Sequence, residues 1–437
     1  MIYIEKTTWS GYINKTFPKL SNDIECDVLV IGGGLCGILC AYKLTEAGKK
    51  VVVLEANNIC GKKSSKTTAT ITAIEDVMYY DLIDTCGFDK AKLYLEANLM
   101  ALNEYRKLSK QIDFDFEECS SYKYSMIDDG EIEKEVAAIK ALGYHCLIKE
   151  HIDLPIKIEK ALEFKNQGQM NPLKLVDNLI NGLEIYEDSK VTKIKENFAF
   201  TENNKIKFTD VIVCTGFPFL KVKGLFFLKM YQKKSHVIEV FDNHGSKGNG
   251  VGTQDNDIYF RNYKDSVLLG CSDERTGYNC NAYDKINKLI VNKYDVRKIK
   301  NRWMNIDTIT LDKMPYIGTY TSYDENIYIA TGFNMWGMTK SMLAANIITD
   351  LIYKKENRFA KLFSPQRKML FKPLMKNIGS AVKEMVKFKT KRCKHLGCPL
   401  YYNEMDQTYE CRCHGSKYDS YGNIIDTPTQ KKINIKK

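Results

Sequence analysis

Four residues near the C-terminus combine cysteine and histidine in two short motifs. Cys393 and His395 form a C-x-H pair, Cys411 and His414 form a C-x-x-H pair, and fifteen residues separate the two pairs. Two facing loops with this spacing can hold a [2Fe-2S] cluster, with two thiolates on one iron and two imidazoles on the other. Because neutral imidazoles replace thiolate charge, such a cluster has a higher reduction potential than an all-cysteine cluster and accepts single electrons.

The alternative for the same four residues is a structural zinc site, since two cysteines and two histidines also bind zinc. Zinc sites usually pair like ligands, as in C-x2-C and H-x3-H, whereas each half of this motif supplies one cysteine and one histidine. The spacing therefore favours a redox cluster over zinc.

The two motifs and their surroundings resemble the Rieske domain. The resemblance extends to a second cysteine pair, Cys398 and Cys413, which in Rieske proteins of cytochrome complexes forms a disulfide between the two cluster loops. The resemblance implies the same disulfide here. A full Rieske domain has several strands before its first ligand loop, whereas a basic segment precedes Cys393 almost directly. We therefore expect a minimal domain that needs the rest of the chain in order to fold.

A second chemical signal lies near the N-terminus. Residues 27–31 predict a buried strand, which leads into the glycines of a G-x-G-x-x-G pattern, a helix over residues 35–47 and a second strand ending at Glu55. In a dinucleotide fold, Gly32 permits the tight turn, Gly34 lets the pyrophosphate approach the helix N-terminus, and Gly37 packs helix on strand. Glu55 is expected to bind ribose hydroxyls, and its charge argues against the 2′-phosphate of NADP.

Six later segments follow in a fixed order, at residues 61–70, 169–175, 191–194, 210–216, 312–318 and 330–339. In sequence and order they resemble the D-amino acid oxidase/glycine oxidase family of flavoproteins, and most closely its branch with a C-terminal Rieske domain. The resemblance covers nearly all of residues 24–360 and implies non-covalently bound FAD, whereas the glycine pattern alone predicts only a dinucleotide. The cofactor-binding residues that it implies beyond the glycine pattern and Glu55 are Thr67, Thr68, Val191, Gly216, Gly332, Gly337, Met338 and Thr339. The flavin ring is expected near Thr67, Thr68, Trp336 and Gly337.

The resemblance also implies the architecture, an α/β fold with a Rossmann-like FAD-binding domain and an inserted α+β substrate domain with a mixed sheet. A minimal C-terminal Rieske domain follows. The expected divisions are a lead-in segment at 1–23, an FAD-binding domain at 24–75, 165–225 and 305–362, a substrate domain at 76–164 and 226–304, a basic amphipathic linker at 363–391 and the Rieske domain at 392–437.

One position departs from the family pattern. In glycine oxidase-like members an arginine that anchors the substrate carboxylate follows a tryptophan and precedes a D-x-x-P segment. Matching Trp303 and Asp312 places Asp307 at that position. Because a carboxylate attracts an ammonium group and repels a carboxylate, Asp307 predicts an amine-type substrate. The alternative is a structural Asp307 that caps a turn or pairs with a lysine such as Lys313. We take Asp307 and Trp336 as the candidate catalytic residues.

These features predict an FAD-dependent oxidoreductase that oxidises a small amine, amino acid or hydroxy acid by hydride transfer. Electrons would pass singly to the Rieske cluster and then to an external one-electron carrier. One alternative is a non-catalytic electron-transfer or redox-sensing protein with both cofactors. Another is a flavin-dependent RNA-modifying enzyme, although no nucleic-acid recognition motif is visible and no nucleic-acid partner is expected.

The chain of 437 residues carries a formal net charge of +11. Part of this charge lies between Arg367 and Lys394, where ten lysines and arginines face one acid, Glu384, and apolar residues recur at helical spacing. We favour docking of this segment on the flavin-binding part of the protein. The alternative is contact with an anionic membrane surface, and nucleic-acid binding is the least favoured.

Export is not expected, because no signal with a basic then apolar pattern and no apolar run of membrane-spanning length is visible. Of the fourteen cysteines, the ten outside the cluster motif show no C-x-x-C spacing, which favours reduced thiols and a cytoplasmic location.

Overall fold

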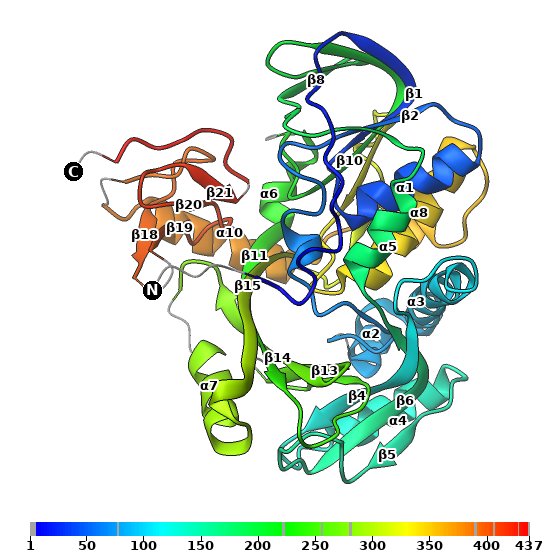
Figure 1. The fold of residues 1–437 in the computed structure, drawn as a ribbon, viewed down its shortest axis with the longest axis vertical. Coiled ribbons are helices and arrows are strands. Elements are labelled where there is room, and N and C mark those ends of the chain that lie inside the picture. The colour runs from blue at the N-terminus through cyan, green and yellow to red at the C-terminus, as the bar shows by residue number, and fades with distance from the viewer. Residues whose placement is uncertain are drawn as a thin grey trace.

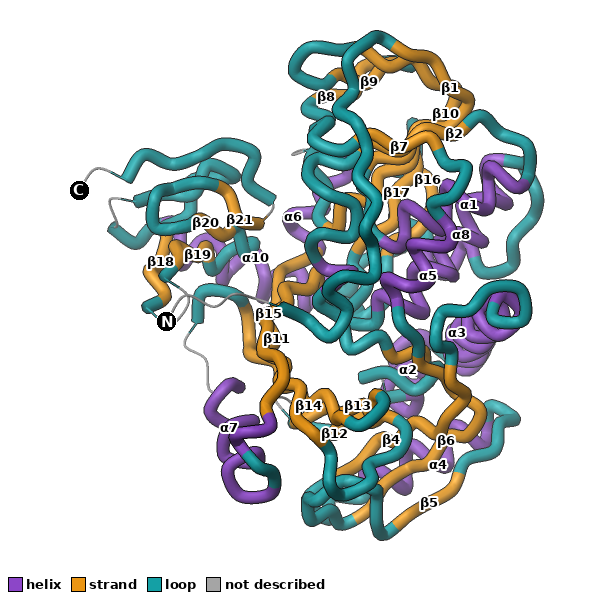
Figure 2. The backbone as a smooth tube through the Cα atoms, in the orientation of Figure 1, coloured by secondary structure: helices purple, strands orange, loops and turns teal. Residues whose placement is uncertain are grey.

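The computed structural model of the chain contains three β-sheets with helices packed around them (Figures 1 and 2). It describes residues 6–76, 78–220, 223–254, 257–278, 282–388, 391–404, 407–426 and 428–435. In the part of the chain so described, no helix is both long enough and apolar enough to cross a membrane.

The first sheet is mainly parallel and has the order β16-β17-β10-β1-β2-β7, with the β8–β9 hairpin attached to β10. Side chains of β1 alternate between two cores: Val28 and Val30 pack with the helices on one face, and Leu29 and Ile31 pack with aromatic residues on the other. Its strands are β1 (Ile24–Ile31), β2 (Val51–Leu54), β7 (Glu184–Tyr186), β8 (Lys193–Lys195), β9 (Phe198–Phe200), β10 (Lys205–Gly216), β16 (Tyr316–Thr319) and β17 (Ile327–Thr331).

Three helices accompany this sheet, and α1 packs against both of the others. They are α1 (Leu35–Glu46), α5 (Pro172–Leu179) and α8 (Gly337–Ile352). Eight of the twelve residues of α1 and eleven of the sixteen residues of α8 are buried, which explains why both helices are apolar around most of their circumference.

The second sheet is antiparallel except for the β12–β4 pair, and has the order β15-β11-β14-β13-β12-β4-β6-β3, with β5 on β6. Its strands are β3 (Thr70–Ile71), β4 (Glu117–Ser125), β5 (Leu147–Lys149), β6 (Lys160–Gln169), β11 (Met230–Phe241), β12 (Asn249–Gly252), β13 (Ile258–Tyr263), β14 (Ser266–Arg275) and β15 (Ile299–Thr310). The accompanying helices are α2 (Tyr79–Cys86), α3 (Phe88–Leu108), α4 (Glu131–Ala141) and α7 (Ala282–Lys293). The predicted domain boundaries at 165 and 305 fall inside β6 and β15, so both strands run through them.

The third sheet is small and lies at the side of the molecule, beside β11, β15 and α6 (Phe226–Lys229) (Figures 1 and 2). It contains β18 (Leu400–Asn403), β19 (Thr408–Cys411), β20 (Lys417–Tyr418) and β21 (Ile424–Asp426). The helices α9 (Ala360–Phe363) and α10 (Phe371–Met385) precede it. Its hydrophobic core consists largely of motif cysteines and Tyr418. Because so small a core stabilises little by itself, the third sheet relies on contacts with the rest of the chain.

Candidate active site and metal centre

The turn between β1 and α1 requires glycine on steric grounds. Gly32 has a φ of +110°, and a Cβ there would lie 2.6 Å from the carbonyl oxygen of Cys214. A Cβ at Gly37 would lie 2.0 Å from the carbonyl oxygen of Gly32. Gly34 is the N-cap of α1 and supplies no side-chain cap. Two N–H groups of this turn already have side-chain acceptors, since Gly33 donates to Glu55 and Leu35 donates to Ser64 Oγ at 2.9 Å. Room for a pyrophosphate comes from the missing side chains of Gly32 and Gly34, which line a cavity.

A cavity of about 310 Å³ opens at this turn, and we call it the nucleotide cavity. Most of the predicted cofactor-binding residues line it. Glu55 stands at its wall, where its two carboxylate oxygens accept hydrogen bonds from the N–H groups of Gly33 (2.8 Å) and Asn57 (2.9 Å). These bonds fix the carboxylate and leave acceptor sites for ribose hydroxyls. The predicted residues in its lining are Gly32, Gly34, Glu55, Thr67, Val191, Gly216, Gly332, Gly337 and Met338.

Thr339 has a different place. Its hydroxyl oxygen accepts the N–H of Thr72 at 3.2 Å and donates to the carbonyl oxygen of Thr72 at 3.3 Å. These two hydrogen bonds join α8 to the segment that follows β3, and Thr339 is fully buried there. Its role in the structure is to attach this segment to the helix.

The loop that carries Thr67 and Thr68 is held by three side chains from distant parts of the sequence. Trp9 Nε1 donates to the carbonyl oxygen of Thr67 at 2.7 Å, and Trp303 Nε1 donates to that of Lys66 at 2.8 Å. The buried Arg261 donates to the carbonyl oxygen of Thr68. The segment before residue 24 thus helps to shape the nucleotide cavity, which no local sequence pattern indicated.

A second cavity of about 630 Å³ lies against the second sheet, and we call it the large cavity. Thr67, Asn305, Asp307 and Met338 line both cavities, so these residues mark where the two meet. The predicted residues Thr68 and Trp336 line the large cavity only. Trp336 Nε1 is buried and lies close enough to the Asp76 carboxyl for the indole N–H to lower the pKa of that carboxyl. Trp336 and Asp76 therefore form a polar pair in the wall of the large cavity.

Asp307 is on β15, opposite Lys233 of β11, and its side chain faces the junction of the two cavities. Asn305 Nδ2 donates to Asp307 Oδ2 at 3.0 Å. Burial raises the pKa of Asp307 to about 6; Lys63 opposes this shift and Asp426 adds to it. The lysine that lowers the pKa of Asp307 is Lys63, and not Lys313, the partner that a purely structural role suggested.

Several residues of the large cavity were not predicted from the sequence. Asp76 faces the cavity; its enclosure raises the pKa of its carboxyl, and Lys233 opposes that shift. Arg275 also lines the cavity, and its guanidinium lies 4.1 Å from the ring centroid of Tyr231. The cavity therefore holds carboxylates and cations, so that it can bind a substrate carrying an ammonium group, a carboxylate or both.

The cysteine–histidine motifs fold into two equivalent loops. The N–H of Gly397 donates to the carbonyl oxygen of Cys393, and the N–H of Gly415 donates to that of Cys411, both at 2.9 Å. A disulfide joins the loops through Cys398 and Cys413, the pairing that the Rieske resemblance implies. The loops bring Cys393, His395, Cys411 and His414 together, and all four side chains are buried.

The state of these four side chains fits an iron–sulfur cluster. His414 Nδ1 is buried with no hydrogen-bond partner among the described residues, while the backbone of Phe227 hydrogen-bonds the same ring. Burial, with the neighbouring His395, lowers the pKa of His414 to about 3, which keeps its imidazole in the neutral form that binds metals. Hydrogen bonding between the two cysteines lowers the pKa of Cys393 to about 6 and raises that of Cys411, so Cys393 is the thiol of the pair that ionises first.

The imidazole side of these loops faces the nucleotide cavity. The His395 ring contacts Phe217 edge-on with centroids 6.2 Å apart, and Phe217 also lines the nucleotide cavity. The His414 ring contacts Phe227 in the same way at 6.1 Å. Residues of the C-terminal segment, among them Asp426 and Thr429, complete the wall of the nucleotide cavity. The predicted cluster site and the nucleotide cavity are therefore adjacent, with Phe217 between them.

The third sheet is docked through buried charges. Glu410 forms ion pairs with Lys234 of β11 (3.7 Å) and Lys417 of β20 (3.3 Å), and the three side chains are at most 2% exposed. Glu410 also accepts the N–H of Gly277 at 3.0 Å, and Arg412 Nε donates to the carbonyl oxygen of Gly277 at 2.7 Å. These bonds connect the third sheet to the turn after β14 and fix its position.

Comparisons with known proteins agree with both halves of this site. Residues 27–351 match the family described as FAD dependent oxidoreductase (DAO), and residues 375–437 match the Rieske [2Fe-2S] domain. The protein YhfW of Bacillus subtilis (strain 168), named as a Rieske 2Fe-2S iron-sulfur protein, is 29% identical over 96% of this chain and 94% of its own length.

Two further relatives cover the larger part of the chain. Gamma-glutamylputrescine oxidoreductase of Escherichia coli (strain K12) is 25% identical over 78% of this chain and 87% of its own length. The crystal structure of glycine oxidase from Geobacillus kaustophilus superimposes with a TM-score of 0.67 at 17% identity, over 79% of this chain and 100% of that structure. This last likeness shows the shared fold.

Proposed function

Because the chain belongs to the DAO family of FAD dependent oxidoreductases and carries a C-terminal Rieske [2Fe-2S] domain, we propose that it oxidises a small amine. In this proposal the electrons leave FAD singly through the Rieske cluster toward an external one-electron carrier. The observation that carries the proposal is Asp307, a carboxylate at the junction of the nucleotide and large cavities.

Each cofactor has a set of residues suited to it. The turn at Gly32–Gly37 and Glu55 would hold the pyrophosphate and ribose of FAD, and the four cysteine and histidine side chains would hold the cluster. FAD, when bound, supplies the acceptor for the two electrons of a C–H bond next to nitrogen, and the cluster takes electrons one at a time.

The residues of the large cavity would bind and orient the amine. Asp307 attracts an ammonium group by charge, and in a partly desolvated cavity this attraction is stronger than in water. With a pKa of about 6, its carboxyl is ionised at neutral pH and can also accept a proton from the ammonium group. Asp76 adds a second carboxyl group to the same cavity, next to the indole N–H of Trp336.

The name of one relative supports an amine substrate. Gamma-glutamylputrescine oxidoreductase is named for an amine-type substrate and covers most of the flavin-binding half of this chain. A second candidate is an amino acid, since Arg275 lies in the same cavity as Asp307. A substrate with both charges could place its ammonium group at Asp307 and its carboxylate at Arg275.

The contact between Phe217 and His395 supports electron transfer between the two cofactors. Phe217 lines the nucleotide cavity on one side and contacts the imidazole on the other, so a single aromatic ring separates the cavity from a predicted cluster ligand. The alternative of a non-catalytic electron-transfer or redox-sensing protein provides no role for the large cavity beside the nucleotide cavity.

Anaerobic reduction of the bound flavin by a panel of amines, amino acids and hydroxy acids tests the proposal. We expect amines to bleach the flavin and the cluster to become reduced afterwards. Asp307→Asn should keep the flavin content and lose amine-driven bleaching. The control Asp265→Asn changes an exposed carboxylate that pairs with Lys300, and this variant should behave as the unmodified protein. If no compound of the panel bleaches the flavin, the non-catalytic alternative is favoured.

A further inference from the structure

The helix α10 has an inner face that docks on the molecule. Asn377 Nδ2 donates to the carbonyl oxygen of Leu228 at 2.9 Å, and Tyr401 donates to Glu384 Oε2 at 2.6 Å. Asn377 and Glu384 are both buried although they are polar. This inner face agrees with the favoured sequence interpretation, in which the basic segment docks on the body.

The outer side of α10 carries a line of exposed apolar side chains. Phe371, Met375, Val382 and Val386 are 75%, 49%, 53% and 70% exposed. Their spacings of four, seven and four residues place them along one line of the helix surface. Phe388, just beyond the helix, is fully exposed as well.

A line of lysines runs beside the apolar line. Lys372, Lys376 and Lys383 each directly follow one of the exposed apolar residues, and all three are exposed. Because successive residues of an α-helix are turned by about 100°, the lysines form a parallel line next to the apolar one. An exposed apolar line bordered by lysines is the pattern of helices that lie in the interface of a lipid bilayer.

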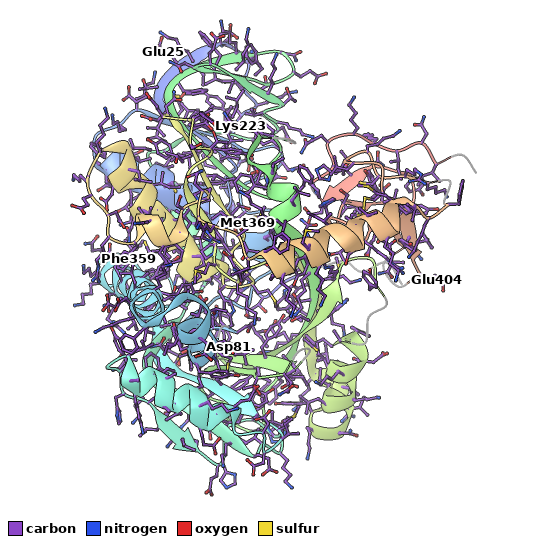
Figure 3. The ribbon with its side chains drawn as sticks, turned by 180° about the vertical axis from the view of Figure 1, so that it is seen from behind. Glu25, Asp81, Lys223, Phe359, Met369 and Glu404 are labelled. Carbon is purple, nitrogen blue, oxygen red and sulfur yellow. A yellow bond between two sulfur atoms is a disulfide. The ribbon has the colours of Figure 1, made fainter. Side chains whose placement is uncertain are left out.

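The position of α10 leaves this surface accessible. In Figure 3 the helix runs along the surface from the neighbourhood of Met369 toward the small sheet, where Glu404 is labelled, and no described helix or strand covers its outer side in that view. Monomeric proteins rarely expose contiguous apolar surface of this kind without a partner.

Charge decides between the possible partners. A second copy of the chain would bring lysine lines together on a protein with a net charge of +11. An anionic phospholipid surface complements these lysines and accepts the apolar side chains at the same time. We propose that α10 binds the surface of an anionic phospholipid bilayer, with Phe371, Met375, Val382 and Val386 inserted among the lipids and the lysines at the headgroups.

Membrane binding through α10 orients the rest of the protein. Pro373, Lys376 and Asn377 line the large cavity, so this cavity lies close to the membrane-binding surface. The chain that follows α10 leads to Cys393 in the first cluster loop. Both the large cavity and the cluster loops are thereby brought near the bilayer, a property that does not depend on which substrate the protein oxidises.

Sedimentation with lipid vesicles tests the proposal on the full-length protein with its cofactors. Vesicles of phosphatidylcholine alone are compared with vesicles of phosphatidylcholine and phosphatidylglycerol. Two double variants are used, Phe371→Ser/Val386→Ser and Lys372→Glu/Lys383→Glu. The control is Val291→Ser, because Val291 is 68% exposed on α7, away from α10. Since all these side chains are exposed, flavin and iron contents should stay unchanged.

We expect the unmodified protein and the control to bind the anionic vesicles and to bind neutral vesicles weakly. Both α10 variants should bind the anionic vesicles roughly tenfold less or weaker, and salt should weaken binding by the unmodified protein. Equal binding by all four proteins, or no binding of the unmodified protein to anionic vesicles, would overturn the proposal. So would a dimer in solution that Phe371→Ser/Val386→Ser converts to monomers, because the surface would then belong to a second copy.

Discussion

Replacing Glu410 by glutamine should loosen the third sheet from the rest of the molecule. Glu410 is the buried carboxylate that pairs with both Lys234 and Lys417, at 3.7 and 3.3 Å. Glutamine has the same shape and can still accept the N–H of Gly277. The variant therefore removes the negative charge and leaves two buried ammonium groups without this counter-charge.

The size of the effect follows from that burial. Removing one partner of a buried ion pair costs about 3–5 kcal/mol, because the remaining charge loses that counter-charge in a medium of low polarity. We expect the free energy of unfolding of the third sheet to fall by about that amount. This corresponds to a population of detached third sheet larger by a factor of roughly 10² to 10⁴.

Denaturant unfolding followed by the visible circular dichroism of the cluster measures this change, and hydrogen exchange of β19 and β20 measures it without denaturant. The control Glu133→Gln breaks an exposed ion pair with Lys160 and should leave both measurements unchanged. A triple variant, Lys234→Met/Glu410→Leu/Lys417→Met, should recover most of the lost stability because it removes all three charges. If Glu410→Gln retains the stability of the unmodified protein, the reasoning from buried charge is refuted.

Three further predictions concern the two redox sites. Amine-driven flavin reduction should become faster as the pH rises through about 6, because Asp307 then ionises; Asp307→Asn should lose this pH dependence and fall in rate by roughly 10²-fold in stopped-flow measurements. The hydroxyl of Tyr418 lies 3.6 Å from Cys393 Sγ and 2.6 Å from Thr429 Oγ1, so its single proton can serve either acceptor. A hydrogen bond to the sulfur stabilises the more negative reduced cluster, so Tyr418→Phe should lower the reduction potential in an EPR redox titration; an unchanged potential would show that the proton is donated to Thr429. Cys398→Ser removes the disulfide between the loops and should lower the ratio of iron to protein after purification; full iron retention would show that the loops hold without it.

Local patterns in the sequence were sufficient for the parts of the site that are built from neighbouring residues. The glycine turn at Gly32–Gly37 and the two cluster loops each depend on residues within a few positions of one another, so their spacing predicts their geometry. Asp307 was also found from the sequence, because its distance from Trp303 matched that of an arginine in the resembled family. The structure places its side chain at the meeting point of both cavities.

The remaining features depend on contacts between distant segments, which leave no local pattern. Asp76, Arg275 and Asp426 reach the cavities from three separate parts of the chain. Thr339 was assigned to the cofactor because it follows Gly337 and Met338 in one motif. In a helix, however, each residue turns by about 100° from the one before, and this turn directs Thr339 to Thr72.

The fixed position of the third sheet has a kinetic consequence. A Cβ on Gly415 would lie 2.3 Å from Gln232 Oε1, so the second cluster loop meets β11 with no gap. Together with the bonds through Gly277 and Glu410, this contact prevents the third sheet from swinging on a hinge between turnovers. The transfer of each electron from flavin to cluster, as proposed, would then be tunnelling across a constant distance, without a diffusive search by a mobile domain. Its rate constant should therefore be insensitive to solvent viscosity.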